Sequence, residues 1–189
     1  MKSSFAILLL ICSIGAAQDS GILTRRGDGV YSNEGLRFRY KPSRDLSNRT
    51  EPFRAEIQKQ AKDSGTSNML NALLAMSSGI DDGAKNWGSV TIETYPRKSA
   101  SERDDVKAEI QMSGWVAHAT GATTPPKFEV ISGQRFAVSL FALQDGKIRK
   151  GAVVWTTVRR GKLLSFAFAA NSPQRLKSLT ESMKSVQFY

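Results

Sequence analysis

The feature that most constrains the fold of this chain is a run of strand-like segments joined by very short turns near its C-terminal end. Asp145-Gly146 is a strong signal for a two-residue hairpin turn, and Arg160-Gly161 marks a second tight turn. Turns this short join antiparallel neighbours, because parallel strands need a crossover of about a dozen residues or more. We therefore predict an antiparallel meander with strands at residues 128–131, 135–143, 148–159 and 163–170.

Further strands are predicted earlier in the chain. Leu36, Phe38 and Tyr40 alternate with basic residues, which is the period of two that a half-buried strand shows. The turn at residues 33–35 should join this strand to residues 30–31 in a hairpin. Apolar stretches at residues 69–76 and 90–94 predict two more strands.

Two helices are predicted between these strands. Phe53, Ile57 and Ala61 recur every four residues, as in a short amphipathic helix that ends near residue 65. A capping-box pattern at residues 101–104 opens a second helix over residues 106–117.

The chain should close with a third helix. Ser172 is a suitable N-cap, and Pro173 suits the first helical position. The apolar side chains that follow share one helical face: Leu176, Leu179, Met183 and Val186. The expected fold class is therefore α+β, an antiparallel β-sheet with helices packed on its faces.

The N-terminus has the layout of a secretory signal. Lys2 precedes an apolar run over residues 5–14, which small residues close at 15–17. The run is shorter than the roughly 20 apolar residues that a membrane-spanning helix needs. We expect residues 1–17 to be a signal peptide cleaved after Ala17, residues 18–29 to be a flexible lead-in and residues 30–189 to form a single domain. The protein should then be periplasmic or secreted, with no transmembrane segment in the mature chain.

Cysteine and charge narrow the chemistry. The only cysteine, Cys12, lies inside the apolar run, and Ile11 is too bulky for the residue before a lipid-modified cysteine. Cleavage after Ala17 would leave no cysteine, which excludes disulfides, thiol catalysis and cysteine-bound metals. Removal of Lys2 leaves 26 basic residues against 17 acidic ones, a formal charge of +9 that favours anionic partners.

Two stretches resemble the PsbP-like superfamily. Residues 31–42, YSNEGLRFRYKP, are similar to the opening hairpin of PsbP-like proteins, with its pattern N-E-x-G-F-x-F-x-Y-P. Residues 133–136, 162–168 and 176–188, which end in SVQF, are similar to that superfamily's strands and final helix. The resemblance implies an α/β/α sandwich in a protein that is an accessory or binding subunit rather than an enzyme. It supplies no catalytic residue.

No residue pattern predicts catalysis, a cofactor or a metal site. His118 is the only histidine, so a Ser-His-Asp triad would have to use it, and we interpret it as a structural residue near a helix end. Asp81-Asp82 could ligate calcium, but a solvated turn explains the pair more simply. Glu93 has no second carboxylate at a defined spacing for glycosidase chemistry.

The basic residues are the remaining functional signal. Lys147–Lys150 and the second tight turn lie at opposite ends of the 148–159 strand, about 35 Å apart at ~3.3 Å per residue, so they cannot form one anion site. Arg160-Gly161 lacks the aromatic residues that follow it in RNA-binding strands, so no nucleic-acid partner is expected. Scattered solvated charges are the simpler interpretation of these basic residues. The candidate contacts for an anion or a partner are Arg37, Arg39 and Lys41 on one strand, with Arg159, Arg160 and Lys162 at the turn.

These observations predict an exported, non-enzymatic binding or accessory protein of the cell envelope, which needs no cofactor. Its partner would be a protein or a small ligand. The alternative is a cationic protein that associates peripherally with anionic envelope lipid or polysaccharide.

Overall fold

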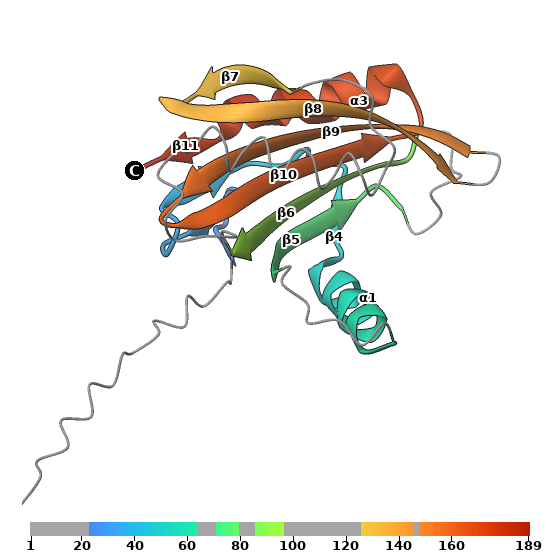
Figure 1. Ribbon diagram of the computed structural model, residues 1–189, viewed down its shortest axis with the longest axis horizontal. Helices are drawn as coiled ribbons and strands as arrows, with labels where there is room; N and C mark the ends of the chain where they lie inside the picture. Colours follow the sequence, from blue (N-terminus) through green and yellow to red (C-terminus); the bar gives the residue numbers. More distant parts are fainter. Residues whose placement is uncertain (1–22, 64–70, 80–85, 97–125, 146–147) are drawn as a thin grey trace, which may run out of the picture.

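The computed structural model describes residues 23–63, 71–79, 86–96, 126–145 and 148–189, which form two antiparallel sheets with helices packed on them (Figure 1). The larger sheet has seven strands in the spatial order β4-β5-β6-β10-β9-β8-β7. In chain order they are β4 (Ser47–Asn48), β5 (Asn71–Ser77), β6 (Gly88–Pro96), β7 (Lys127–Ile131), β8 (Gln134–Asp145), β9 (Ile148–Arg159) and β10 (Lys162–Ala170).

The smaller sheet has four short strands in the order β1-β2-β3-β11. They are β1 (Thr24–Arg25), β2 (Tyr31–Asn33), β3 (Phe38–Tyr40) and β11 (Gln187–Phe188). The described helices are α1 (Thr50–Asp63), α3 (Pro173–Thr180) and a 3₁₀ helix, η1 (Glu181–Ser185), which follows α3 directly. Among these described segments no helix has the length and apolarity needed to cross a membrane.

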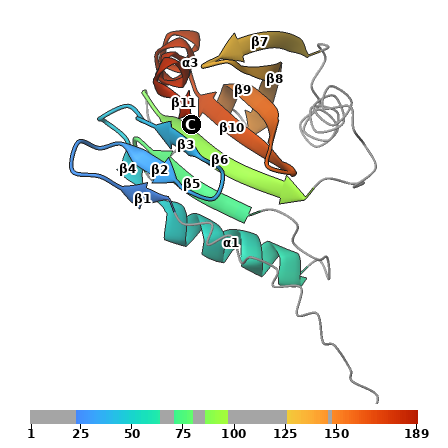
Figure 2. The same cartoon turned by 90° about the vertical axis from the view of Figure 1, so that its left-hand side faces the viewer.

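The core lies between one face of the larger sheet and a layer made of α3, η1 and the smaller sheet (Figure 2). Leu164, Phe166 and Phe168 alternate along β10 and are fully buried on that face. The ring of Phe166 meets the rings of Phe38 and Tyr40 edge-on, at centroid distances of 5.6 and 5.8 Å. Aromatic packing of this kind joins the smaller sheet to the larger one.

Helix α3 packs so closely on the larger sheet that two glycines are needed beneath it. A Cβ atom at Gly88 would lie 2.6 Å from Cδ1 of Leu179, and one at Gly151 would lie 2.9 Å from Cδ2 of Leu176. Both distances are shorter than carbon atoms tolerate, so the absence of side chains at these positions sets the depth of the helix.

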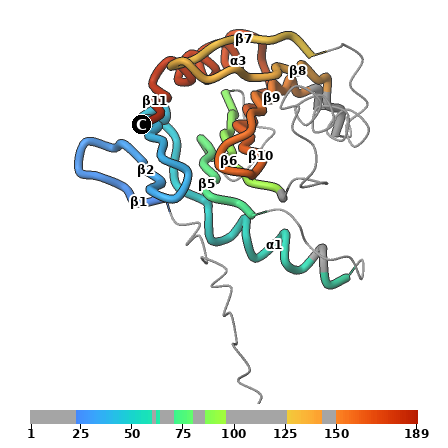
Figure 3. The backbone as a smooth tube through the Cα atoms, turned by 60° about the vertical axis from the view of Figure 1, so that its left-hand side comes forward, coloured from blue at the N-terminus to red at the C-terminus, as the bar shows by residue number. Residues whose placement is uncertain are grey.

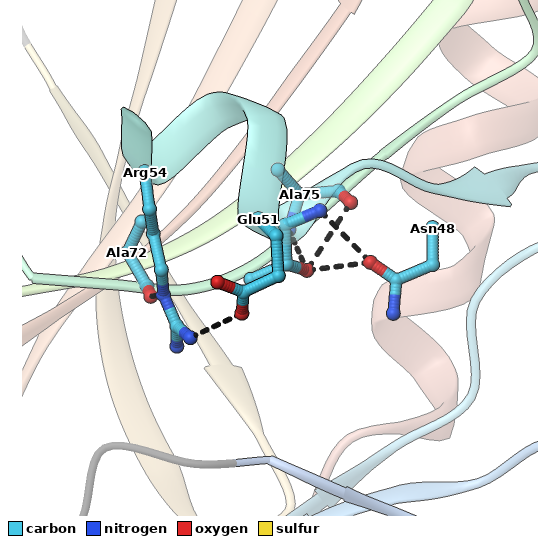
Figure 4. A network of polar contacts seen from close by, with 6 residues as sticks. Asn48, Glu51, Arg54, Ala72 and Ala75 are labelled. Carbon is cyan, nitrogen blue, oxygen red and sulfur yellow. Dashed lines mark hydrogen bonds and ion pairs between the residues drawn. The ribbon is translucent and has the colours of Figure 1, made fainter. Parts of the chain in front are cut away.

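Helix α1 lies beside β5 and is anchored at its first turn (Figures 3 and 4). The Thr50 hydroxyl accepts a hydrogen bond from the Ala75 amide at 3.1 Å. Arg54 donates from Nε to the carbonyl oxygen of Ala72 at 2.8 Å and from Nη1 to Glu51 at 2.8 Å. The start of the helix is therefore fixed to the backbone of β5.

The predicted meander is confirmed as β7 to β10, and the predicted early hairpin is confirmed as β2 and β3. The strands predicted at residues 69–76 and 90–94 correspond to β5 and β6. The predicted helix over residues 106–117, His118, Asp81-Asp82 and the predicted signal peptide lie outside the described residues.

Two expectations are corrected. The lead-in at 18–29 is not wholly flexible, because Thr24–Arg25 pair with β2 through a turn in which the Arg26 amide donates to the Val30 carbonyl at 2.8 Å. The final helix is shorter than its apolar face predicted: α3 ends at Thr180, and the chain tightens into η1. Leu179, Met183 and Val186 are buried nonetheless, because the tighter turn keeps them over the core.

Candidate binding site

The predicted contact residues do not form one surface. Arg37 lies in the turn before β3 with φ of 51°, and is not on the strand face that the alternation predicted for it. Arg39 is half-buried, with its guanidinium 5.0 Å from the ring centre of Tyr189. Lys41 is exposed and follows the end of β3.

At the β9–β10 turn the cations are divided between structural and exposed positions. Arg159 donates from Nε to the carbonyl oxygen of Leu36 at 2.9 Å and from Nη2 to that of Tyr189 at 3.2 Å. Its guanidinium also lies 5.0 Å from the ring centre of Phe188. We therefore interpret Arg159 as a structural residue that ties the two sheets together. Arg160 is exposed at φ of 48°, and Lys162 is half-buried.

A cavity of about 710 Å³ lies between the β1–β2 hairpin and the segment that links β3 to β4. Arg25, Lys41 and Arg44 line it together with one carboxylate, Asp28. All three cationic residues are exposed. Of the six predicted contact residues, only Lys41 lines this cavity, which we call the cationic cavity.

Lys41 is held in place through its backbone. Its amide donates to the Ser185 hydroxyl at 2.9 Å, and its carbonyl accepts from the same hydroxyl at 3.0 Å. Next to it, the Tyr40 hydroxyl is 2.8 Å from the Ser182 hydroxyl, and burial raises the pKa of Tyr40 above its usual value. The 3₁₀ helix η1 thus fixes the backbone from which the Lys41 side chain projects.

Arg44 stands at the tip of a turn closed by the Leu46 amide, which donates to the Ser43 carbonyl at 3.3 Å. The next residue, Asp45, forms an ion pair with Arg175 of α3 and accepts a hydrogen bond from Ser43. Burial opposes ionisation of Asp45, but these hydrogen bonds and the charge of Arg175 outweigh it and lower the pKa of Asp45. The charge of Arg175 therefore already balances the negative charge of Asp45, so Asp45 does not cancel the charge of Arg44.

Two side-chain acceptors of the cavity wall are occupied too. Asp28 accepts a hydrogen bond from the Val30 amide at 3.1 Å. The Asn48 side-chain oxygen accepts from both the amide and the hydroxyl of Thr50, at 2.9 and 2.7 Å (Figure 4). What Asn48 can still offer is its amide N–H donors. Together with the three cationic side chains, these amide groups give the wall a set of hydrogen-bond donors.

Polar surface exceeds apolar surface in the cavity. Among its apolar lining residues, Pro42 is half-buried, whereas Tyr31, Leu46 and Met76 are only 3%, 7% and 6% exposed. Such a site binds polar groups through charge and hydrogen bonds rather than through burial of a hydrocarbon chain.

A separate acidic group lies on β6. Glu93 accepts a hydrogen bond from the Tyr95 hydroxyl at 2.5 Å. Burial raises the pKa of Glu93 above its usual value, although this hydrogen bond opposes the shift. In the part of the chain that the structure describes, no three His, Cys, Asp or Glu side chains lie together as metal ligands.

The sequence did not predict Arg25 and Arg44 as site residues. Arg25 lies in a stretch without an apolar pattern, and Arg44 lies in a polar segment, so neither carries a periodic signal. The one local hint is the polar run at residues 43–45, which is typical of a turn. Convergence of these cations with Lys41 depends on contacts between distant segments.

No family model and no curated protein sequence matches this chain. Several solved structures are similar to it in fold. The solution structure of cyanobacterial PsbP (CyanoP) from Synechocystis sp. PCC 6803 aligns with a TM-score of 0.54 at 12% sequence identity, over 88% of this chain and 98% of that chain. The chain therefore has the PsbP-like fold that residues 31–42 and the C-terminal segments predicted.

Two further structures show weaker similarity. LpqN, involved in cell envelope biogenesis of Mycobacterium tuberculosis, aligns at a TM-score of 0.42 and 8% identity, over 64% of this chain and 79% of that chain. A protein of Bacteroides thetaiotaomicron aligns at 0.44 and 10% identity, over 80% of this chain but 45% of its own length. The fold assignment therefore rests on the similarity to CyanoP.

Proposed function

We propose that this protein is an exported, non-enzymatic binding or accessory protein of the cell envelope, which recognises an anionic ligand or partner at the cationic cavity. The observation that carries the proposal is the positive charge of the cavity wall, which Arg25, Lys41 and Arg44 line together. The nearby negative charge of Asp45 is balanced by Arg175. The N-terminal sequence pattern supports export to the periplasm or the exterior.

A second candidate function is peripheral association with anionic envelope lipid or polysaccharide through the whole charged surface. It is favoured by the formal charge of +9 expected for the mature chain and by exposed cations that do not line the cavity, such as Arg160 and Lys184. In that case each exposed cation would contribute about equally, because long-range attraction depends on total charge.

One binding experiment separates the two functions. We would measure binding of purified protein to three probes: glycerol 3-phosphate, glucuronate, and phosphatidylcholine vesicles that contain phosphatidic acid. Lys41→Glu and Lys184→Glu change the charge equally, and only Lys41 lines the cavity. Recognition at the cavity predicts that Lys41→Glu weakens binding at least about tenfold and Lys184→Glu about twofold.

Equal weakening by both variants would favour the diffuse association instead. Failure of the wild-type protein to bind any of the three probes would overturn both functions. Chemical conversion of a bound probe, followed by mass spectrometry, would contradict the non-enzymatic part of the proposal.

A further inference from the structure

We infer that the cationic cavity binds a phosphate-bearing polar group. The guanidinium groups of Arg25 and Arg44 and the ammonium group of Lys41 would contact the phosphate oxygens. This inference rests on the proposed function and names the ligand class of the same site. The phosphate could belong to a soluble molecule or to a lipid headgroup, because the chemistry at the cavity is the same in both.

The charged side chains of the cavity wall offer more hydrogen-bond donors than acceptors. Arginine and lysine side chains donate only, while Oδ1 of Asp28 and Oδ1 of Asn48 already accept from Val30 and Thr50. A ligand rich in hydroxyl groups needs acceptors as well as donors to bind well. An anion with several oxygens needs donors only, which is what this wall supplies.

The charge of the wall favours a ligand with more than one negative charge, because the lining residues include three cations against one carboxylate. A phosphate monoester carries about 1.5 to 2 negative charges at neutral pH and has three terminal oxygens, whereas a carboxylate has a single charge and two oxygens. Three separate cationic groups therefore match a phosphate monoester better than a carboxylate.

The size and polarity of the space suit a small polar group. At about 710 Å³ the cavity lies within the range of about 300–1,000 Å³ that small-ligand sites have. Three of its apolar residues, Tyr31, Leu46 and Met76, are more than nine-tenths buried and offer little surface to an acyl chain. If the phosphate belongs to a lipid, the headgroup occupies the cavity and the chains stay outside.

The test is a calorimetric titration of the purified protein with glycerol 3-phosphate, glucuronate and glycerol at fixed ionic strength. We expect glycerol 3-phosphate to bind at least about tenfold more tightly than glucuronate, and glycerol not to bind. Equal binding of the phosphate and the carboxylate would overturn the inference while leaving an anion-binding function intact. No binding of either, together with no binding to vesicles, would overturn the function itself.

Matched variants locate the binding. Arg25 and Arg26 are neighbours and both are exposed, but only Arg25 lines the cavity. Arg25→Ala should weaken glycerol 3-phosphate binding at least about tenfold, and Arg26→Ala should change it less than about twofold, although both remove one charge. Equal effects would show that the net charge and not the cavity binds the phosphate, which would overturn the inference.

Two further measurements sharpen the result. Arg44→Lys keeps the positive charge but removes the planar guanidinium group that can donate two hydrogen bonds to one phosphate, so it should weaken phosphate binding several-fold. Unchanged affinity would contradict the contact proposed for Arg44. Saturating glycerol 3-phosphate should displace the protein from phosphatidic acid vesicles, because soluble and lipid-borne phosphate would share the cavity. Vesicle binding that resists this competition would show that the lipid is held elsewhere and would contradict a shared site.

Discussion

The close packing of α3 on the larger sheet gives a quantitative prediction. Leu179 is 1% exposed, and its Cδ1 atom fills the space above Gly88. Leu179→Ala removes three carbon atoms from the core, worth about 0.8 kcal/mol each in transfer, and leaves a cavity that adds to the cost. Because leucine and alanine are both good helix formers, helix propensity contributes little. We expect the free energy of unfolding to fall by about 3 kcal/mol.

The opposite change, Gly88→Ala, overfills the same space. Its new Cβ atom would lie 2.6 Å from Leu179 Cδ1 and 3.0 Å from Arg175 Nε. Such overpacking costs about 1–3 kcal/mol. In the double variant the methyl group added at position 88 occupies the volume that the Leu179 side chain vacates. The double variant should therefore lose about 1–2 kcal/mol less than the two single losses combined.

Urea unfolding followed by circular dichroism measures all three variants. Lys177→Ala is the control, because Lys177 is exposed on the same helix; its cost should stay well under about 1 kcal/mol. Losses that are additive to within about 0.5 kcal/mol would show that Leu179 and Gly88 do not share a packing space. A Leu179→Ala loss as small as that of the control would show that α3 is not docked on the sheet.

Three further predictions concern processing, titration and capping. Mass spectrometry of the exported protein should find Gln18 as the first residue, and an acylated cysteine at the N-terminus would refute this. The raised pKa of Glu93 means that the folded state disfavours the ionised carboxylate. The stability that the protonated carboxyl contributes is therefore fully present below the ordinary pKa of 4.5 and is lost as pH rises through the higher folded pKa. Glu93→Gln should gain stability over wild type as pH increases, and parallel pH profiles would contradict this. Ser172→Ala should cost about 1 kcal/mol in thermal unfolding, because the Ser172 hydroxyl accepts from the Arg175 amide at 3.2 Å; a loss below about 0.3 kcal/mol would show that the cap contributes little.

Local patterns predicted most of the large sheet. The bounds of β9, Ile148–Arg159, are those that alternation and the two flanking turns indicated. Side-chain period and turn chemistry are properties of neighbouring residues, so they can be read without knowing the fold. Strand β1 was missed for the complementary reason. Its two residues are exposed and pair through backbone hydrogen bonds, which leave no apolar pattern in the sequence.

The candidate site was predictable only in part, because distant segments build it. Arg175 and Asp45 are separated by 130 positions, and their ion pair holds the turn that carries Arg44. Ser185 fixes the backbone of Lys41 across 144 positions. The charge pattern of the sequence predicted Lys41 as a contact residue. It also predicted Arg159, which instead donates a hydrogen bond to the carbonyl oxygen of Leu36. Charge can be counted in a sequence, but the neutralisation of individual charges depends on tertiary contacts.

The most direct test of binding at the cationic cavity is to map the bound ligand on the protein by nuclear magnetic resonance. Amide chemical shifts of the ¹⁵N-labelled protein would be followed during titration with glycerol 3-phosphate. We predict saturable shifts concentrated at residues 25–29 and 41–48, which surround the cavity, with no change at the β9–β10 turn. Shifts centred on residues 159–162, or spread evenly over the exposed cations, would contradict a binding site at the cationic cavity.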